Sequence, residues 1–173
     1  SGMTVMAHAA AGVVAAYVIQ RAAHQPFHLG VAGLAALLSG LPDLDLLWGW
    51  WRRRRAGGEG HNPHHALWTH TPLFWGIWGL CLAWAFHLPV ALVLGLAFVH
   101  LALDSLGTDD GIMWLWPWRR RQYALWPRDL HAPGVRGLAF YRRYYRQPLF
   151  LALELSLLVL AGAIVAHELV SIP

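Results

Sequence analysis

Five apolar segments, separated by polar and arginine-rich stretches, limit the folds open to this chain. Hydrophobic residues make up 57% of its 173 residues and charged residues only 13%, whereas charged residues are about 25% of a typical soluble domain. A helix of about 20 apolar residues spans a bilayer. The five segments are Val5–Ile19, Phe27–Trp51, Pro72–Phe86, Pro89–Leu106 and Pro148–Val170. We therefore predict an all-α, multi-pass membrane bundle of about four to five apolar helices, forming one domain over residues 1–173.

The ends of these segments carry recognisable helix signals. Thr71 followed by Pro72 provides an N-cap and a proline at the first helical position, so a helix should begin there. The stretch Ser39–Pro42 should interrupt the second segment, because Gly followed by Pro stops helices. If the chain is extended at this break, Asp43 and Asp45 face the same way, whereas in a continuous helix they diverge by about 200°. The first segment is the weakest candidate for a span, and a buried helix is the alternative.

Arginine placement predicts the orientation of the bundle. Every basic residue is Arg, and all but Arg21 fall in two loops, residues 52–70 and 107–147. Since basic loops stay in the cytoplasm, we place the N-terminus and both loops there and the C-terminus outside, in a bacterial or archaeal inner membrane. Binding of nucleic acid by the arginine blocks is the less favoured reading. Ser1-Gly2 before Met3 is expected to be a remnant of tag removal.

His100 and Asp104 lie one helical turn apart in the apolar fourth segment, so they share one helix face. Ionisable groups are costly in such segments and mark functional sites, although a structural hydrogen-bonded pair is the alternative. With five crossings, further His and Asp residues reach the same cytoplasmic side: His8, Asp43, Asp45, His64, His65 and His70. The remaining candidates fall on the outer side and are poor ones: His24, His87 and His167. Cys81 is the only cysteine, so a metal there would use His and carboxylate ligands, which suit zinc or manganese.

The ordered motifs resemble the YdjM-like family of membrane-bound metal-dependent hydrolases over residues 4–127. The motifs are an N-terminal His8, LPDLD at Leu41–Asp45, HALWTH at His65–His70 and HLALDSLGTDDGIMWLWPW at His100–Trp118. This resemblance implies a set of metal ligands: His8, Asp43, Asp45, His65, His70, His100 and Asp104. Ala66 stands where the family usually has Arg. The family is distantly similar to the all-α zinc phospholipases C and single-strand nucleases.

On this resemblance we expect a membrane hydrolase with two or three divalent ions, Zn²⁺ or alternatively Mn²⁺. Zinc lowers the pKa of its bound water to about 7, and the resulting hydroxide would cleave a phosphate ester of a lipid or lipid-linked substrate. The residues expected to act directly in catalysis are Asp45, Asp104 and His65. Alternatively, Asp45 or Asp104 orients a ligating histidine without binding the metal itself. The residues expected to contact the substrate phosphate are Arg119, Arg120 and Arg121. The expected partners are membrane lipids, and no nucleic acid is expected.

Other interpretations remain open at this point. The same ligands would suit a metal-binding or metal-transport protein, and a catalytically degenerate scaffold could dock a nucleic-acid or protein partner. Glu154 in the last segment could be a ligand, a proton relay or a helix–helix hydrogen-bonding group, and we favour a structural role. The Asp109-Asp110 pair is expected to be solvated. Four tryptophans are expected to form an interfacial belt: Trp114, Trp116, Trp118 and Trp126.

Overall fold

The computed structural model describes residues 3–45, 51, 65, 67–107, 111–125 and 138–171. Within these ranges the chain is helical, with an isolated bridge between Ile112 and Tyr123 and no strand. The elements are α1 (Val5–Ala22), α2 (Leu29–Gly40), the 3₁₀ turns η1 (Leu41–Asp43) and η3 (Trp68–His70), α4 (Pro72–Ala85), α5 (Val90–Gly107), α6 (Leu138–Tyr145) and α7 (Pro148–Val170). The prediction of an all-α fold is therefore confirmed.

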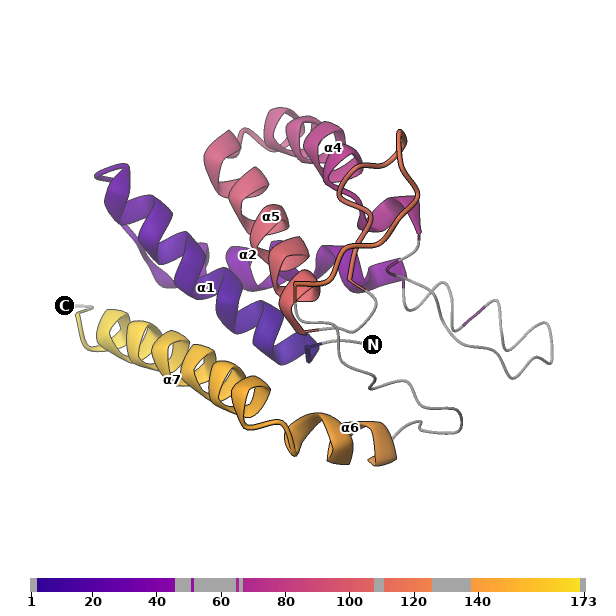
Figure 1. The fold of residues 1–173 in the computed structure, drawn as a ribbon. Coiled ribbons are helices and arrows are strands. Elements are labelled where there is room, and N and C mark those ends of the chain that lie inside the picture. Colours follow the sequence, from indigo (N-terminus) through magenta and orange to yellow (C-terminus); the bar gives the residue numbers. More distant parts are fainter. Residues whose placement is uncertain are drawn as a thin grey trace.

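Helix α1 lies at the centre and packs against α2, α5 and α7 (Figure 1). Its neighbours α2 and α5 run antiparallel to it. Near the start of α1, the His8 carbonyl accepts a 2.8 Å hydrogen bond from Ser39 at the end of α2, and the His8 ring stacks on His100. Towards the other end of α1, Ile19 lies against Gly95 in the first half of α5. The beginning of α1 therefore meets the ends of α2 and α5.

Helices α4 and α7 begin at this same end of the bundle. Trp75, in the first turn of α4, packs with Ala97 and Leu101 of α5, whereas Gly79, further along α4, lies against Leu94, nearer the start of α5, so these two helices are antiparallel. Glu154, near the start of α7, accepts hydrogen bonds from Thr4 just before α1. The starts of α1, α4 and α7 and the ends of α2 and α5 consequently gather at one end, which we call the site end.

Two helices, α1 and α7, are long and apolar enough to cross a membrane. Only 17% of the most apolar stretch of α7 is buried within the protein. Side chains such as Leu155, Val159 and Leu160 are exposed along this helix. Three further apolar helices are shorter: Leu29–Asp43, Pro72–Ala85 and Val90–Leu106. The segment that looked weakest in the sequence is thus one of the two candidate spans. Crossing of the bilayer by the shorter helices stays a prediction.

The expected helix boundaries are largely confirmed. The Thr71 hydroxyl accepts a 3.3 Å hydrogen bond from the Phe74 amide and caps α4, with proline at the first helical position. The interruption after Ser39 is also present, and of the two geometries considered for the residues after it, the structure has the helical one. Residues 41–43 form the 3₁₀ turn η1, and Leu44 continues in right-handed helical geometry (φ −62°, ψ −23°). The backbone passes from α-helix into a 3₁₀ turn and stays helical, so Asp43 and Asp45 point in different directions.

The predicted loop 107–147 contains more structure than expected. Residues 111–125 form a loop that is closed by the bridge between Ile112 and Tyr123. Two hydrogen bonds of 2.8 Å fasten it to Ser105 in α5: the Trp114 indole donates to the Ser105 hydroxyl, and the Leu125 amide donates to the Ser105 carbonyl. Helix α6 was not predicted, because its eight residues are too few to show a clear helical period of hydrophobic residues.

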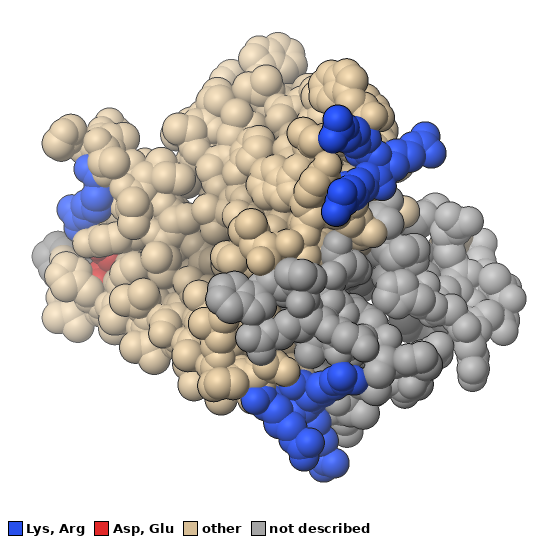
Figure 2. Space-filling view, viewed as in Figure 1, with Lys and Arg blue, Asp and Glu red and all other residues tan. Residues whose placement is uncertain are grey.

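Charged residues are grouped at the two ends of the face shown in Figure 2, with a broad uncharged surface between them. Exposed arginines on the loop 111–125 and on α6 lie towards the site end, and Arg21 pairs with Glu168 at the opposite end. The multi-pass topology and the cytoplasmic assignment of the site end stay predictions. Several residues considered above lie outside the described ranges: Ser1, Gly2, Arg52–Arg55, His64, Ala66, Asp109, Asp110, Trp126, Arg128 and Arg136.

The packing of α1 on α2 predicts a specific cost for one added methyl group. A Cβ at Gly12 would lie 2.6 Å from the Ser39 Cβ and 2.7 Å from the Ala35 carbonyl oxygen, whereas a Cβ at Gly33 would meet nothing within 4 Å. We expect Gly12→Ala to destabilise the protein by about 1–3 kcal/mol through overpacking, and Gly33→Ala to stabilise it by about 0.5–1 kcal/mol through helix propensity. Thermal unfolding in one detergent measures both, and equal melting temperatures would contradict this helix packing.

Candidate metal centre

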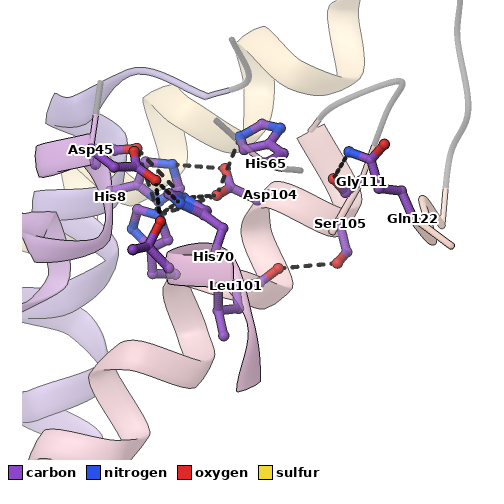
Figure 3. Close-up of polar contacts among 12 residues, drawn as sticks. His8, Asp45, His65, His70, Leu101, Asp104, Ser105, Gly111 and Gln122 are labelled. Carbon is purple, nitrogen blue, oxygen red and sulfur yellow. Dashed lines mark hydrogen bonds and ion pairs between the residues drawn. The ribbon is translucent and has the colours of Figure 1, made fainter. Parts of the chain in front are cut away.

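Seven acidic and imidazole side chains converge at the site end of the bundle (Figure 3). They come from α1, from the turn after α2, from the segment before α4 and from α5: His8, Asp43, Asp45, His65, His70, His100 and Asp104. The four histidines and Asp104 are each at most 1% exposed. The structure therefore brings together every residue that the motifs singled out as a ligand.

Asp104 lies at the centre of this group. Its Oδ1 is 3.3 Å from His8 Nε2. Its Oδ2 is 3.1 Å from His100 Nε2, 3.3 Å from His70 Nε2 and 3.5 Å from His65 Nε2. One buried carboxylate is thus surrounded by imidazole nitrogens from three separate parts of the chain.

Asp43 adds a second carboxylate on one side of this group. Its Oδ1 lies 3.7 Å from His100 Nε2 and 4.0 Å from His70 Nε2. These two nitrogens are themselves 3.4 Å apart. Two imidazoles and two carboxylates therefore face a common point.

The outer hydrogen bonds define which ring nitrogens carry protons. His100 Nδ1 lies 2.7 Å from the Ser39 carbonyl oxygen, which can only accept, so Nδ1 is the donor. His70 Nδ1 lies 3.0 Å from Asp45 Oδ2 and donates in the same way. In neutral imidazoles both Nε2 atoms then present lone pairs to each other and to the carboxylates. A cation relieves this repulsion, and metal-binding histidines characteristically donate their other N–H to a carbonyl or carboxylate.

The distances within the cluster fit a small divalent cation. Ligands at 2.0–2.1 Å from a tetrahedral zinc are about 3.3–3.4 Å apart, and the contacts of Asp104 with the four histidines span 3.1–3.5 Å. Three sets of donor atoms lie within 4.8 Å of one another: His8, His100 and Asp104; Asp43, His70 and His100; His65, His70 and Asp104. Each set has three donors, which leaves a fourth position of a four-coordinate ion for water or substrate.

The electrostatics of the cluster favour added positive charge. Burial lowers the pKa of His70, but hydrogen bonds to Asp104 and Asp45 outweigh it and raise this pKa to about 10. The two carboxylates that favour a proton on this imidazole equally favour a metal cation beside it. The cluster is therefore suited to hold a cation in an otherwise apolar part of the protein.

Asp45 occupies a different place from the one its motif suggested. Two roles were considered for it, facing one ion together with Asp43 or orienting a ligating histidine, and its contacts fit the second: its Oδ2 accepts from His70 Nδ1 at 3.0 Å and from the Thr69 hydroxyl at 2.8 Å. It therefore lies against the ring nitrogen of His70 that points away from Asp104, outside the three donor sets. The helical geometry of residues 41–45 explains this, because side chains two apart on a helix diverge by about 200°.

Sequence reasoning missed two contributors to the cluster. The Ser39 carbonyl orients His100, and the Ser39 hydroxyl bonds to the His8 backbone. Thr69 supports Asp45. Backbone carbonyls and lone hydroxyls carry no motif of their own, so only the folded chain identifies them.

The three arginines predicted to bind substrate, Arg119, Arg120 and Arg121, lie at the surface. All are exposed on the loop 111–125, and the Arg121 guanidinium lies 5.6 Å from the centre of the Tyr123 ring. This loop is fastened to Ser105, the residue that follows Asp104 in the chain. Their role in substrate binding stays a prediction.

A family model described as the YdjM inner membrane protein matches residues 3–170. The chain belongs to the YdjM inner membrane protein family. The predicted resemblance is therefore confirmed over almost the whole chain. Searches of the curated proteins and of the solved structures find no match.

The position of Asp45 in this YdjM family member predicts a graded loss of metal affinity. Asp45→Ala should weaken zinc binding about 10–100-fold while leaving the number of bound ions unchanged, because it removes only the group that orients His70. Asp104→Ala should remove most of the bound zinc, because two of the three donor sets include this carboxylate. Competition with a chromophoric chelator measures both. Complete loss of zinc in Asp45→Ala would show instead that Asp45 is a direct ligand.

Proposed function

We propose that this YdjM-family protein is a membrane-embedded, metal-dependent hydrolase that acts on a phosphate ester of a lipid or lipid-linked substrate at the cytoplasmic face. The observation that carries the proposal is the convergence of four buried histidines on Asp104. Clusters of this kind in a cleft or at an interface are the usual basis for assigning an unknown active site. The family description adds an inner-membrane location.

The three donor sets favour more than one cation, with zinc as the first choice. Asp104 contacts His8 through Oδ1 and the other three histidines through Oδ2, so its two oxygens serve different donor groups. A carboxylate used in this way is suited to link two ions. When bound, such ions would act as Lewis acids that lower the pKa of water and stabilise negative charge on a phosphoryl oxygen.

The remaining residues are assigned by their contacts. Asp43, His70 and His100 hold the cation, and Asp45 and the Ser39 carbonyl keep the two imidazoles aligned. His65 belongs to one donor set, so it would exchange a proton with a leaving oxygen while the other ligands keep the cation. General acid–base help of this kind contributes about 10²–10⁴-fold to a rate.

The location of the cluster favours a headgroup-level substrate. His8 lies in the first turn of α1 and Asp104 in the last turn of α5, so the cluster sits at the helix ends. A transporter requires its binding site near the middle of the bilayer, which makes metal transport the weaker candidate. The exposed arginines of the loop 111–125 would bind the substrate phosphate through paired N–H groups.

The proposed activity is tested with detergent-purified, zinc-loaded protein and phospholipid in mixed micelles. We expect release of a phosphate-containing headgroup or of inorganic phosphate, lost on chelation, restored by Zn²⁺ or Mn²⁺, and absent in Asp104→Asn, which keeps the side-chain shape without the charge. Glu168→Gln, at the opposite end of the bundle, serves as the control and should retain full activity. Zinc-loaded protein that cleaves no phosphate ester across phospholipid, lipid-linked and soluble substrates would refute the proposal.

A further inference from the structure

A second buried carboxylate, Glu154 in α7, is held by four hydrogen bonds. It is 3% exposed. Its Oε1 accepts from the Thr4 amide and the Tyr144 hydroxyl, both at 3.0 Å. Its Oε2 accepts from the Thr4 hydroxyl at 3.2 Å and the Tyr145 hydroxyl at 3.0 Å. An ionised carboxylate has about four acceptor positions, so every one of them is used.

Thr4 connects Glu154 to the metal centre. The Thr4 hydroxyl accepts a 3.2 Å hydrogen bond from the Ala7 amide and caps α1. The Thr4 carbonyl accepts the amide of His8 at 3.1 Å, which closes the first turn of the helix. His8 Nε2 then faces Asp104 Oδ1 at 3.3 Å. A continuous series of short contacts therefore runs from Glu154 through the first turn of α1 to a candidate ligand.

The first turn of a helix needs such support. The first four amides of a helix have no partner within it, and helix ends fray when nothing outside holds them. Here the Thr4 amide and hydroxyl are both held by one residue of a different helix. If that residue were lost, the Thr4 amide and hydroxyl would lose their partner outside α1, and the turn that carries His8 would keep its contacts with Ser39 and His100.

The tyrosines fix Glu154 from the other side. Tyr144 is fully buried and stacks on Phe150, with 5.1 Å between ring centres. Burial, and then the neighbouring Glu154 carboxylate, raise the pKa of Tyr144 and of Tyr145 above the usual value, so both phenols keep the protons that they donate. The corner between α6 and α7 thereby holds the carboxylate in one orientation towards Thr4.

We propose that Glu154 is a positioning residue of the metal centre, which sets the place of His8 through Thr4. This inference rests on the metal centre proposed above. It assigns a function to a residue that lies outside all three donor sets. It also explains why a carboxylate is retained in a helix that is otherwise apolar.

The test measures cobalt and zinc affinity of the full chain in detergent. Glu154→Leu, similar in size but without an acceptor, should weaken affinity about 10–100-fold, the usual effect of losing an outer-shell partner. Glu154→Gln keeps one acceptor oxygen and should lie between Glu154→Leu and wild type. Glu168→Leu is the matched control, because Glu168 lies on the same helix but contacts Arg21 at the other end. It should bind like wild type.

A double-mutant cycle separates positioning from general loosening. Two of the three donor sets lack His8, so His8→Ala should retain measurable affinity. If Glu154 acts through His8, adding Glu154→Leu to His8→Ala should weaken binding no further. The Co²⁺ absorption spectrum of Glu154→Leu should also resemble that of His8→Ala. An equal loss from Glu154→Leu in both backgrounds, or wild-type affinity in Glu154→Leu, would overturn the inference.

The result also separates this inference from the proposal on which it rests. Wild-type protein that binds neither cobalt nor zinc would refute both. Wild-type protein that binds metal, with Glu154→Leu unchanged, would refute only the role of Glu154.

Discussion

The Asp104 carboxylate is the group around which the rest of the structure is organised. A buried ionised carboxylate is costly unless it is paired, and Asp104 is 1% exposed. Four imidazoles surround it at 3.1–3.5 Å. Two of these rings already use their Nδ1 protons elsewhere, on the Ser39 carbonyl and on Asp45. A positive charge between the Asp104 carboxylate and these imidazole nitrogens would stabilise the cluster, and a divalent cation bound there would supply it.

The apolar helices bring most of these groups together at their ends. His8, Asp43, His70 and Asp104 each lie in or beside a terminal turn, where polar atoms are least costly to an apolar helix. The alternating direction of neighbouring helices places those terminal turns side by side (Figure 1). Outer contacts then fix each imidazole in place. The same logic extends to Glu154, which holds the turn that carries His8.

Much of this centre could be predicted from local sequence. The spacing of His100 and Asp104 places them on one helix face whatever the tertiary fold, and they do contact at 3.1 Å. Thr71 before Pro72 defines the start of α4 through purely local hydrogen bonding. Arginine placement and the alternation of crossings placed all the candidate ligands on one side, and the structure gathers the seven that it describes at one end.

Other features depend on contacts that sequence patterns do not encode. Whether Asp45 faces the same ion as Asp43 depends on whether residues 41–45 are helical or extended, and Ser-Gly-Leu-Pro allows both. Helix α6 has only eight residues, too few for a clear period. The four donors to Glu154 include Thr4, 150 positions away in the chain. Local propensity cannot predict such a partner, because it is determined by the packing of α1 on α7.

The central claim is that the cluster around Asp104 binds a metal ion. The most direct test is elemental analysis of detergent-purified wild-type protein, with His100→Ala measured alongside it. The account predicts one or more equivalents of zinc or manganese per chain in the wild type, and a clear loss in the variant, since His100 belongs to two of the three donor sets. Wild-type protein that contains no metal and takes up neither added zinc nor added manganese would contradict it.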